Sequence, residues 1–166
     1  GGQYPPGSTF KMGVAQAALE LGVIGFEDQV FCSGYMDLGN RRFHCWRKGG
    51  HGNMSLATAI QQSCDVYFFD IAKRVGVDRI AAMAHRFGFG ETLGLEINGE
   101  KPGFIPTKDW KLAVTGTPWQ KGETLNTGIG QGYVLATPLQ LCVMAARLGS
   151  GRAVVPHLIA SEVPTD

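Results

Sequence analysis

Ser8 and Lys11 stand three positions apart, where a Pro-Pro-Gly turn leads into a helical pattern. Side chains at i and i+3 share one face of a helix, so the Lys11 amine can reach the Ser8 hydroxyl. Serine is a weak nucleophile without an adjacent base, and a neutral lysine amine can be that base. Serine is also a preferred helix N-cap, so the pair alone fits either a nucleophile or a simple cap.

A second set of reactive side chains has the pattern C-x12-C-x5-H-x12-C. Its members are Cys32, Cys45, His51 and Cys64. Three thiolates and one imidazole form a closed tetrahedral set for structural zinc, although the spacing is not that of a standard zinc finger. A Cys32–Cys45 disulfide and unlinked buried thiols are the alternatives.

The composition is that of an ordinary globular protein. Of the 166 residues 44% are hydrophobic and the net charge is +1, with a pI near 7.9 and a mean hydropathy of −0.01. Basic residues cluster only in Asn40–His51, which we expect to be a solvated loop, so nucleic acid is not an expected partner. There is neither a signal peptide nor a run of about 18 apolar residues. Because the sequence opens on Gly1 without an initiator Met, we interpret it as part of a longer protein.

The elements that must position these residues are mostly helices. Apolar residues recur with a helical period, usually up to a glycine, in 9–22, 54–62, 65–76, 77–90 and about 137–148. Cys142, on the last of these helices, is expected in the core. Residues 26–52 are expected to form a long irregular loop with a short hairpin at most, 94–110 a loop, and 152–164 a short strand. The expected fold class is therefore mainly α, with too few strands for a self-contained sheet.

Several motifs together resemble the penicillin-binding protein family. The stretch "YPPGSTFK", with Ser8 and Lys11, is similar to the family's Ser-x-x-Lys motif. Ser63-Cys64-Asp65 stands where the family has Ser-x-Asn or, in some members, Ser-x-Asp. Residues 128–141, "GIGQGYVLATPLQL", resemble the family's Gly-Gln-Gly…Thr-Pro-Leu-Gln stretch. Together with "CDVYFFDIAKRVGVDRI", "RFGFG" and "PTKDWK", they make the chain most similar to the penicillin-binding protein 2 group of class B transpeptidases, which act in rod-shape cell-wall synthesis.

The resemblance implies a D,D-transpeptidase that cross-links peptidoglycan stem peptides through a serine acyl-enzyme and is acylated by β-lactam antibiotics. Ser8 is then the nucleophile, Lys11 its general base, Ser63 the proton shuttle and Asp65 the group that positions them. Because a carboxylate cannot donate hydrogen bonds, Asp65 is not expected to grip a substrate carbonyl as an asparagine would. Catalysis of this kind requires no cofactor. Some relatives carry a metal in the segment of the cysteines, which adds weight to zinc there.

The family's third motif, Lys-Thr/Ser-Gly, is absent, so the substrate-binding residues stay unassigned. The stretch "VTGT" at Val114–Thr117 has valine in place of the lysine and is interpreted as a loop without that role. We interpret residues 1–166 as a partial transpeptidase domain that ends before the Lys-Thr-Gly strand. It would be the helical subdomain of the family's α/β fold, with the central sheet largely missing. The fragment alone is expected to be a weak or inactive catalyst.

The resemblance also implies partners and a location. Stem peptides and β-lactams are the expected ligands, and a SEDS-family glycosyltransferase and other elongation-complex proteins the expected partners. The expected location is the periplasmic face of the bacterial inner membrane, with the anchor outside this chain. A serine β-lactamase and a β-lactam-sensing domain are the alternatives, and residues 128–141 favour the transpeptidase over both.

Overall fold

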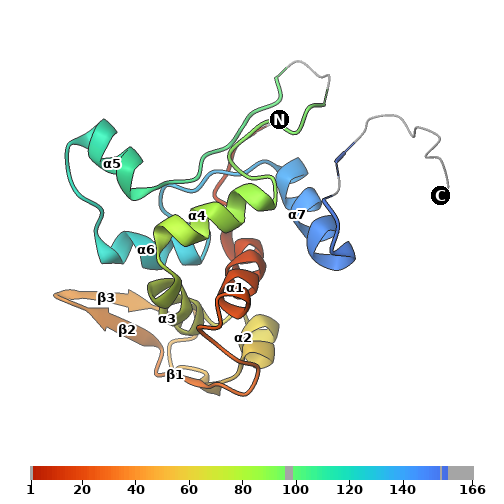
Figure 1. The fold of residues 1–166 in the computed structure, drawn as a ribbon. Coiled ribbons are helices and arrows are strands. Elements are labelled where there is room, and N and C mark those ends of the chain that lie inside the picture. Colours follow the sequence, from red (N-terminus) through yellow and green to blue (C-terminus); the bar gives the residue numbers. More distant parts are fainter. Residues whose placement is uncertain (1, 96–98, 154, 157–166) are drawn as a thin grey trace.

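The computed structural model describes residues 2–95, 99–153 and 155–156, and helices dominate this part of the chain (Figure 1). The helices are η1 (a 3-10 turn, Gly7–Phe10), α1 (Lys11–Glu20), α2 (Leu56–Gln62), α3 (Asp65–Val75), α4 (Val77–Arg86), α5 (Lys108–Thr115), α6 (Lys121–Gly128) and α7 (Pro138–Ser150). The mainly helical character confirms the expected fold class.

Two small antiparallel sheets account for the strands of the described residues. Their members are β1 (Val30–Cys32), β2 (Tyr35–Leu38), β3 (Arg41–His44) and β4 (Gly52–Met54). β2 and β3 form a hairpin that extends away from the helices (Figure 1), and β1 pairs with β4. Gly39 takes a φ of +59° in the two-residue hairpin turn, a conformation that glycine adopts without steric cost. The region expected to be an irregular loop with a hairpin thus contains the hairpin and a second short ladder.

Helix α3 lies at the centre of the core. It packs against α1 on one side and α6 on the other, and its consecutive aromatic residues Tyr67, Phe68 and Phe69 are all buried. A Cβ on Gly128 of α6 would lie 2.3 Å from the Cβ of Ala72, so only glycine permits this close approach of the two helices. The close contact between α3 and α6 fixes the segment that leads into the glycine-rich loop after α6.

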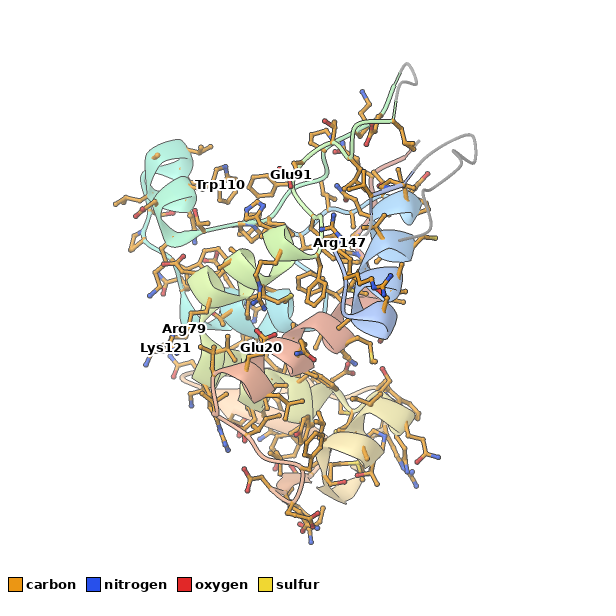
Figure 2. All side chains as sticks on the ribbon, turned by 45° about the vertical axis from the view of Figure 1, so that its right-hand side comes forward. Glu20, Arg79, Glu91, Trp110, Lys121 and Arg147 are labelled. Carbon is orange, nitrogen blue, oxygen red and sulfur yellow. The ribbon has the colours of Figure 1, made fainter. Side chains whose placement is uncertain are left out.

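Helices α5 and α6 were not expected from the sequence. α5 begins at the N-cap Thr107, whose side chain accepts a hydrogen bond from the Trp110 backbone amide. Trp110, labelled in Figure 2, packs at a tilt against Phe104 and edge-on against Tyr133, with ring centroids 4.6 and 5.2 Å apart. These contacts join α5 to the segment after α6. Both helices have only eight residues. Packing against α3 stabilises α6, whereas α5 buries little of its own surface and is bounded by the Thr107 N-cap and by Gly116.

Three further expectations concern the end of α4, the position of Cys142 and a strand near the C-terminus. The helix expected at 77–90 ends earlier, at Arg86. The expectation of Cys142 in the core was wrong, because this thiol lies on the exposed side of α7. Most of the strand expected at 152–164 falls outside the described residues. Among the described helices, none combines the length and the apolar character that crossing a bilayer requires.

Candidate active site and cysteine–histidine cluster

Ser8 lies in η1, immediately before α1, and its residue is exposed to solvent. The preceding Gly7 has a φ of +61° and donates its backbone N–H to the Gly130 carbonyl at 2.9 Å. A Cβ on Gly130 would lie 2.3 Å from the Gly7 oxygen, so a side chain there would displace the serine turn. The glycine-rich loop therefore passes directly against the turn that presents Ser8.

Lys11 begins α1 and is almost fully buried, with 3% of its surface exposed. Its Nζ donates to the Ser63 hydroxyl at 3.0 Å, to the Ser63 carbonyl at 3.1 Å and to Asp65 Oδ1 at 2.7 Å. The ammonium group has three protons, so each of them has an acceptor. The structure thus brings three of the four expected catalytic residues into one hydrogen-bonded network.

The fourth residue, Ser8, stands outside that network. Among the described residues no hydrogen bond joins the Ser8 hydroxyl to the Lys11 amine. The two side chains are nevertheless one helical turn apart at the start of α1, and Ser8 is exposed to solvent. Catalytic hydrogen bonds are often absent in a substrate-free site and form in the complex.

Ser63 occupies an unusual backbone conformation. It forms the C-cap of α2 with a φ of +52°, and it is the only described non-glycine residue with a positive φ. A non-glycine residue in this left-handed region costs about 1–3 kcal/mol, so surrounding contacts must hold it there. Its carbonyl accepts from Lys11 Nζ and also from the indole N–H of Trp46 at 3.0 Å.

Trp46 was not identified from the sequence as a residue of this site. Its backbone N–H donates to Asp65 Oδ2 at 2.9 Å, and its indole N–H donates to the Gln62 carbonyl at 3.2 Å as well as to Ser63. These contacts join residues 16 to 19 positions apart in the chain. No local sequence pattern predicts contacts between residues so far apart in the chain. The only signal in the sequence is that Trp46 directly follows Cys45.

The four expected metal ligands do come together. Their sulfur and nitrogen atoms all lie within 4.8 Å of one another, and the three cysteines are buried. The cluster gathers the end of β1, the residue after β3, the residue before β4 and the N-cap of α3. All four described cysteines are free thiols, which disfavours the alternative of a Cys32–Cys45 disulfide.

The spacing of the cluster fits a tetrahedral ion. His51 Nδ1 lies 3.6 Å from Cys32 Sγ and 3.5 Å from Cys45 Sγ. A tetrahedron with Zn–S bonds of about 2.3 Å and Zn–N bonds of about 2.05 Å places S and N about 3.5 Å apart. The His51 ring therefore faces the thiols with Nδ1, while its Nε2 is buried without a hydrogen-bond partner. The donor set and its geometry therefore suit zinc.

The pKa values of Cys64 and His51 are both shifted in the metal-free cluster. Burial raises the pKa of the Cys64 thiol to about 12, with a further contribution from Cys32. Burial and the neighbouring charge of Arg47 lower the pKa of His51. A neutral Cys64 thiol and a neutral His51 imidazole are thus favoured in the metal-free cluster. Zinc stabilises thiolates directly, so binding would release protons from the cysteines.

With this geometry in hand, comparison with known proteins identifies the class. The chain matches the family described as "Penicillin binding protein transpeptidase domain" over residues 1–165, and it belongs to that family. Among curated relatives it is 42% identical over 161 residues to the peptidoglycan D,D-transpeptidase MrdA of Haemophilus influenzae, covering 95% of this chain and 25% of that protein. It is 38% identical to MrdA of Salmonella typhimurium, covering 97% of this chain and 26% of that protein.

Solved structures of penicillin-binding protein 2 have the same fold. The fold matches penicillin-binding protein 2 of Pseudomonas aeruginosa in complex with WCK 5153, with a TM-score of 0.90 and 44% identity over 94% of this chain and 36% of that one. It also matches penicillin-binding protein 2 of Helicobacter pylori in complex with MreC, with a TM-score of 0.89 and 37% identity over 93% of this chain and 29% of that one. The resemblance inferred from the sequence motifs is therefore confirmed. The chain spans about a quarter of the length of the curated relatives it matches.

Proposed function

We propose that the complete protein containing this chain is a serine-type peptidoglycan D,D-transpeptidase of cell-wall elongation. The observation that carries the proposal is the buried Lys11 amine, held between the Ser63 hydroxyl and the Asp65 carboxylate one helical turn from Ser8. The relatives described as peptidoglycan D,D-transpeptidases support the same reaction. Because this chain covers a quarter of their length, the reaction belongs to the whole protein and not to residues 1–166 alone.

Each residue has a defined task in the proposed acylation step. Lys11, as a neutral amine, takes the proton of the Ser8 hydroxyl while Ser8 Oγ bonds to the carbonyl carbon of the penultimate D-alanine. The C–N bond then breaks, and the leaving terminal D-alanine receives a proton through the Ser63 hydroxyl, which already accepts from the Lys11 amine. In the second half-reaction an amine of a neighbouring stem peptide attacks the carbonyl carbon of the Ser8 ester. The new C–N bond is the cross-link, the ester C–O bond breaks, and the proton lost by the amine returns to Ser8 Oγ through Lys11.

Asp65 acts on the network and not on the substrate in this proposal. Its Oδ1 accepts from Lys11 and its Oδ2 from the Trp46 backbone amide, so both oxygens are engaged inside the protein. This occupancy agrees with the expectation that the carboxylate orients Lys11 or Ser63. The Val114–Thr117 stretch forms the last residues of α5, its glycine cap and the residue beyond, which supports the interpretation that it does not replace the missing lysine motif. We propose that a strand outside residues 1–166 supplies that motif.

We further propose that Cys32, Cys45, His51 and Cys64 hold a structural zinc ion. The ion would tie β1, β3 and β4 to the N-terminus of α3, next to Asp65. No step of the acyl transfer needs the ion. Metal analysis of protein prepared without added zinc is expected to give one zinc per chain, and a value near zero would end this part of the proposal.

The proposed setting is the periplasmic face of the bacterial inner membrane, where peptidoglycan stem peptides and β-lactams are accessible. The match to a complex of penicillin-binding protein 2 with MreC, and to a chain of a peptidoglycan synthase complex, supports partners within an elongation complex. We propose a SEDS-family glycosyltransferase among these partners. A zinc-free variant that still binds such partners would separate the role of the metal from that of the interface.

The reaction is tested with the complete transpeptidase, a donor ending in D-Ala-D-Ala and an acceptor amine. Released D-alanine should equal the cross-linked product, and Ser8→Ala should abolish both. Rapid turnover of nitrocefin with little cross-linking would instead indicate a β-lactamase. Stable acylation without any cross-linking would indicate a β-lactam sensor.

A further inference from the structure

The backbone of Trp46 fixes one side of the Asp65 carboxylate. The Trp46 N–H donates to Asp65 Oδ2 at 2.9 Å while Lys11 Nζ donates to Oδ1 at 2.7 Å. A carboxylate with a different donor on each oxygen cannot rotate without breaking one of these bonds. The Trp46 N–H therefore helps to fix the orientation of the Asp65 carboxylate, which accepts the hydrogen bond of the Lys11 amine.

The indole of Trp46 fixes a second group that receives the same amine. Its Nε1–H donates to the Ser63 carbonyl at 3.0 Å and to the Gln62 carbonyl at 3.2 Å. The last carbonyls of a helix lack intrahelical partners, so the indole N–H completes the C-terminus of α2. The Ser63 carbonyl also accepts from Lys11 Nζ at 3.1 Å, so the indole and the amine share one acceptor. Because Ser63 has a φ of +52°, this bond also helps to hold a strained residue.

The same side chain touches the cysteine–histidine cluster. Trp46 follows Cys45 in the chain, and its ring packs edge-on against the His51 ring with centroids 5.0 Å apart. The residue as a whole is nevertheless 62% exposed, so burial of the ring in the core does not explain its contacts. Trp46 is thus the residue that joins the cluster to Ser63 and Asp65, the two residues that accept from the Lys11 amine.

We propose that Trp46 is a positioning residue that holds Ser63 and Asp65 where they present the Lys11 amine to Ser8. This inference rests on the proposed function, since it assigns Trp46 a task in the same acylation. Trp46 touches none of the reacting atoms; it acts through the two residues it orients. A second consequence is that the cysteine–histidine cluster, although it takes no part in the chemistry, sets the position of Trp46 through Cys45 and His51.

The test uses Trp46→Phe in the complete transpeptidase. Phenylalanine keeps a ring against His51 and the backbone N–H to Asp65, and removes only the indole donor. Under single-turnover conditions, acylation by a β-lactam is separated into the acylation rate k2 and the binding constant K. We expect k2 to fall about tenfold, the equivalent of one lost hydrogen bond, while K stays unchanged. Zinc content and thermal stability should stay close to those of the unaltered protein.

Trp119→Phe is the matched control. Trp119 also donates its indole N–H, to Thr124 Oγ1 at 2.8 Å, but this bond lies at the start of α6 and outside the Lys11 network. The control should leave k2 unchanged. A Trp46→Phe variant with unaltered k2 would overturn the inference. So would an equal fall of k2 in the Trp119→Phe control, or a fall of k2 in Trp46→Phe that is accompanied by loss of zinc. Failure of the unaltered protein to acylate at Ser8 would instead overturn the proposed function, so the two failures are distinguishable.

Discussion

Replacing Asp65 with asparagine would restore the more common form of the family's second motif, and we expect it to impair this protein. Asp65 is only 16% exposed and pairs with a Lys11 side chain that is 4% exposed. Its two oxygens accept from two different donors, the Lys11 amine and the Trp46 backbone amide. An asparagine has one acceptor oxygen, so its amide nitrogen must face one of these donors.

The magnitude follows from that mismatch. A donor left without a partner costs about 1–3 kcal/mol, and because Trp46 is exposed, water can take over part of the loss. We therefore expect Asp65→Asn to destabilise the protein by about 1–2 kcal/mol. If the same energy is lost in the transition state, acylation slows roughly tenfold, since about 1.4 kcal/mol corresponds to a factor of ten. Asp65→Ala removes both acceptors and the partner of a buried cation, which costs about 3–5 kcal/mol.

The assay combines denaturant unfolding with single-turnover acylation of the complete transpeptidase. Asp70→Asn is the control, because Asp70 pairs with Arg74 one turn away on α3 at a more exposed position, where such a pair contributes about 0.3–0.5 kcal/mol. An Asp65→Asn variant that is as stable as the unaltered protein and acylates as fast or faster would refute the reasoning. It would indicate that residue 65 contacts the substrate as an asparagine would.

Three further predictions concern the supports of the site. Cys64→Ser should abolish zinc binding and lower the melting temperature, as measured by metal analysis and calorimetry, whereas full zinc retention would contradict the proposed ligand set. Burial raises the pKa of Tyr67 to about 12, so ionisation of this group should leave the free energy of unfolding unchanged below pH 10 and lower it as the pH rises from 10 toward 12. Tyr67→Phe removes a buried hydroxyl without a partner, so unfolding at pH 7 should show equal or greater stability and a weaker alkaline loss. Gly130→Ala should slow acylation far more than Gly22→Ala, because both glycines have positive φ but only Gly130 faces the Gly7 backbone; equal effects would contradict this.

Much of the helical framework could be predicted from the sequence because the relevant signals are local. The apolar periods at 54–62, 65–76 and 137–148 correspond to α2, α3 and α7. The capping box of α7, in which Thr137 and Gln140 bond to each other's backbone amides, is also local. Helix α6 escaped prediction because packing against α3, and not its own eight residues, stabilises it. Helix α5 escaped because Leu112 and Val114 are exposed, so its eight residues have no buried apolar face to mark them.

The candidate site divides in the same way. Ser8 with Lys11, and Ser63 with Asp65, could be found because each pair lies within one short motif, and the cysteines and His51 could be found because few residue types bind zinc. The contact of Lys11 with Ser63 and Asp65 spans more than 50 positions and follows only from the packing of α1 on α3. Trp46 follows the end of β3 and contacts residues 16 to 19 positions away, so only the folded arrangement reveals its role.

The central claim, that Ser8 is the nucleophile of an acyl-enzyme, is tested most directly by intact mass and peptide mapping after incubation with penicillin. The complete transpeptidase should gain the mass of one penicilloyl group, located on the peptide that contains Ser8. Ser8→Ala should gain none, and the isolated 166-residue chain should react slowly or not at all. A penicilloyl group on another residue, or an unchanged yield of adduct in Ser8→Ala, would contradict the account.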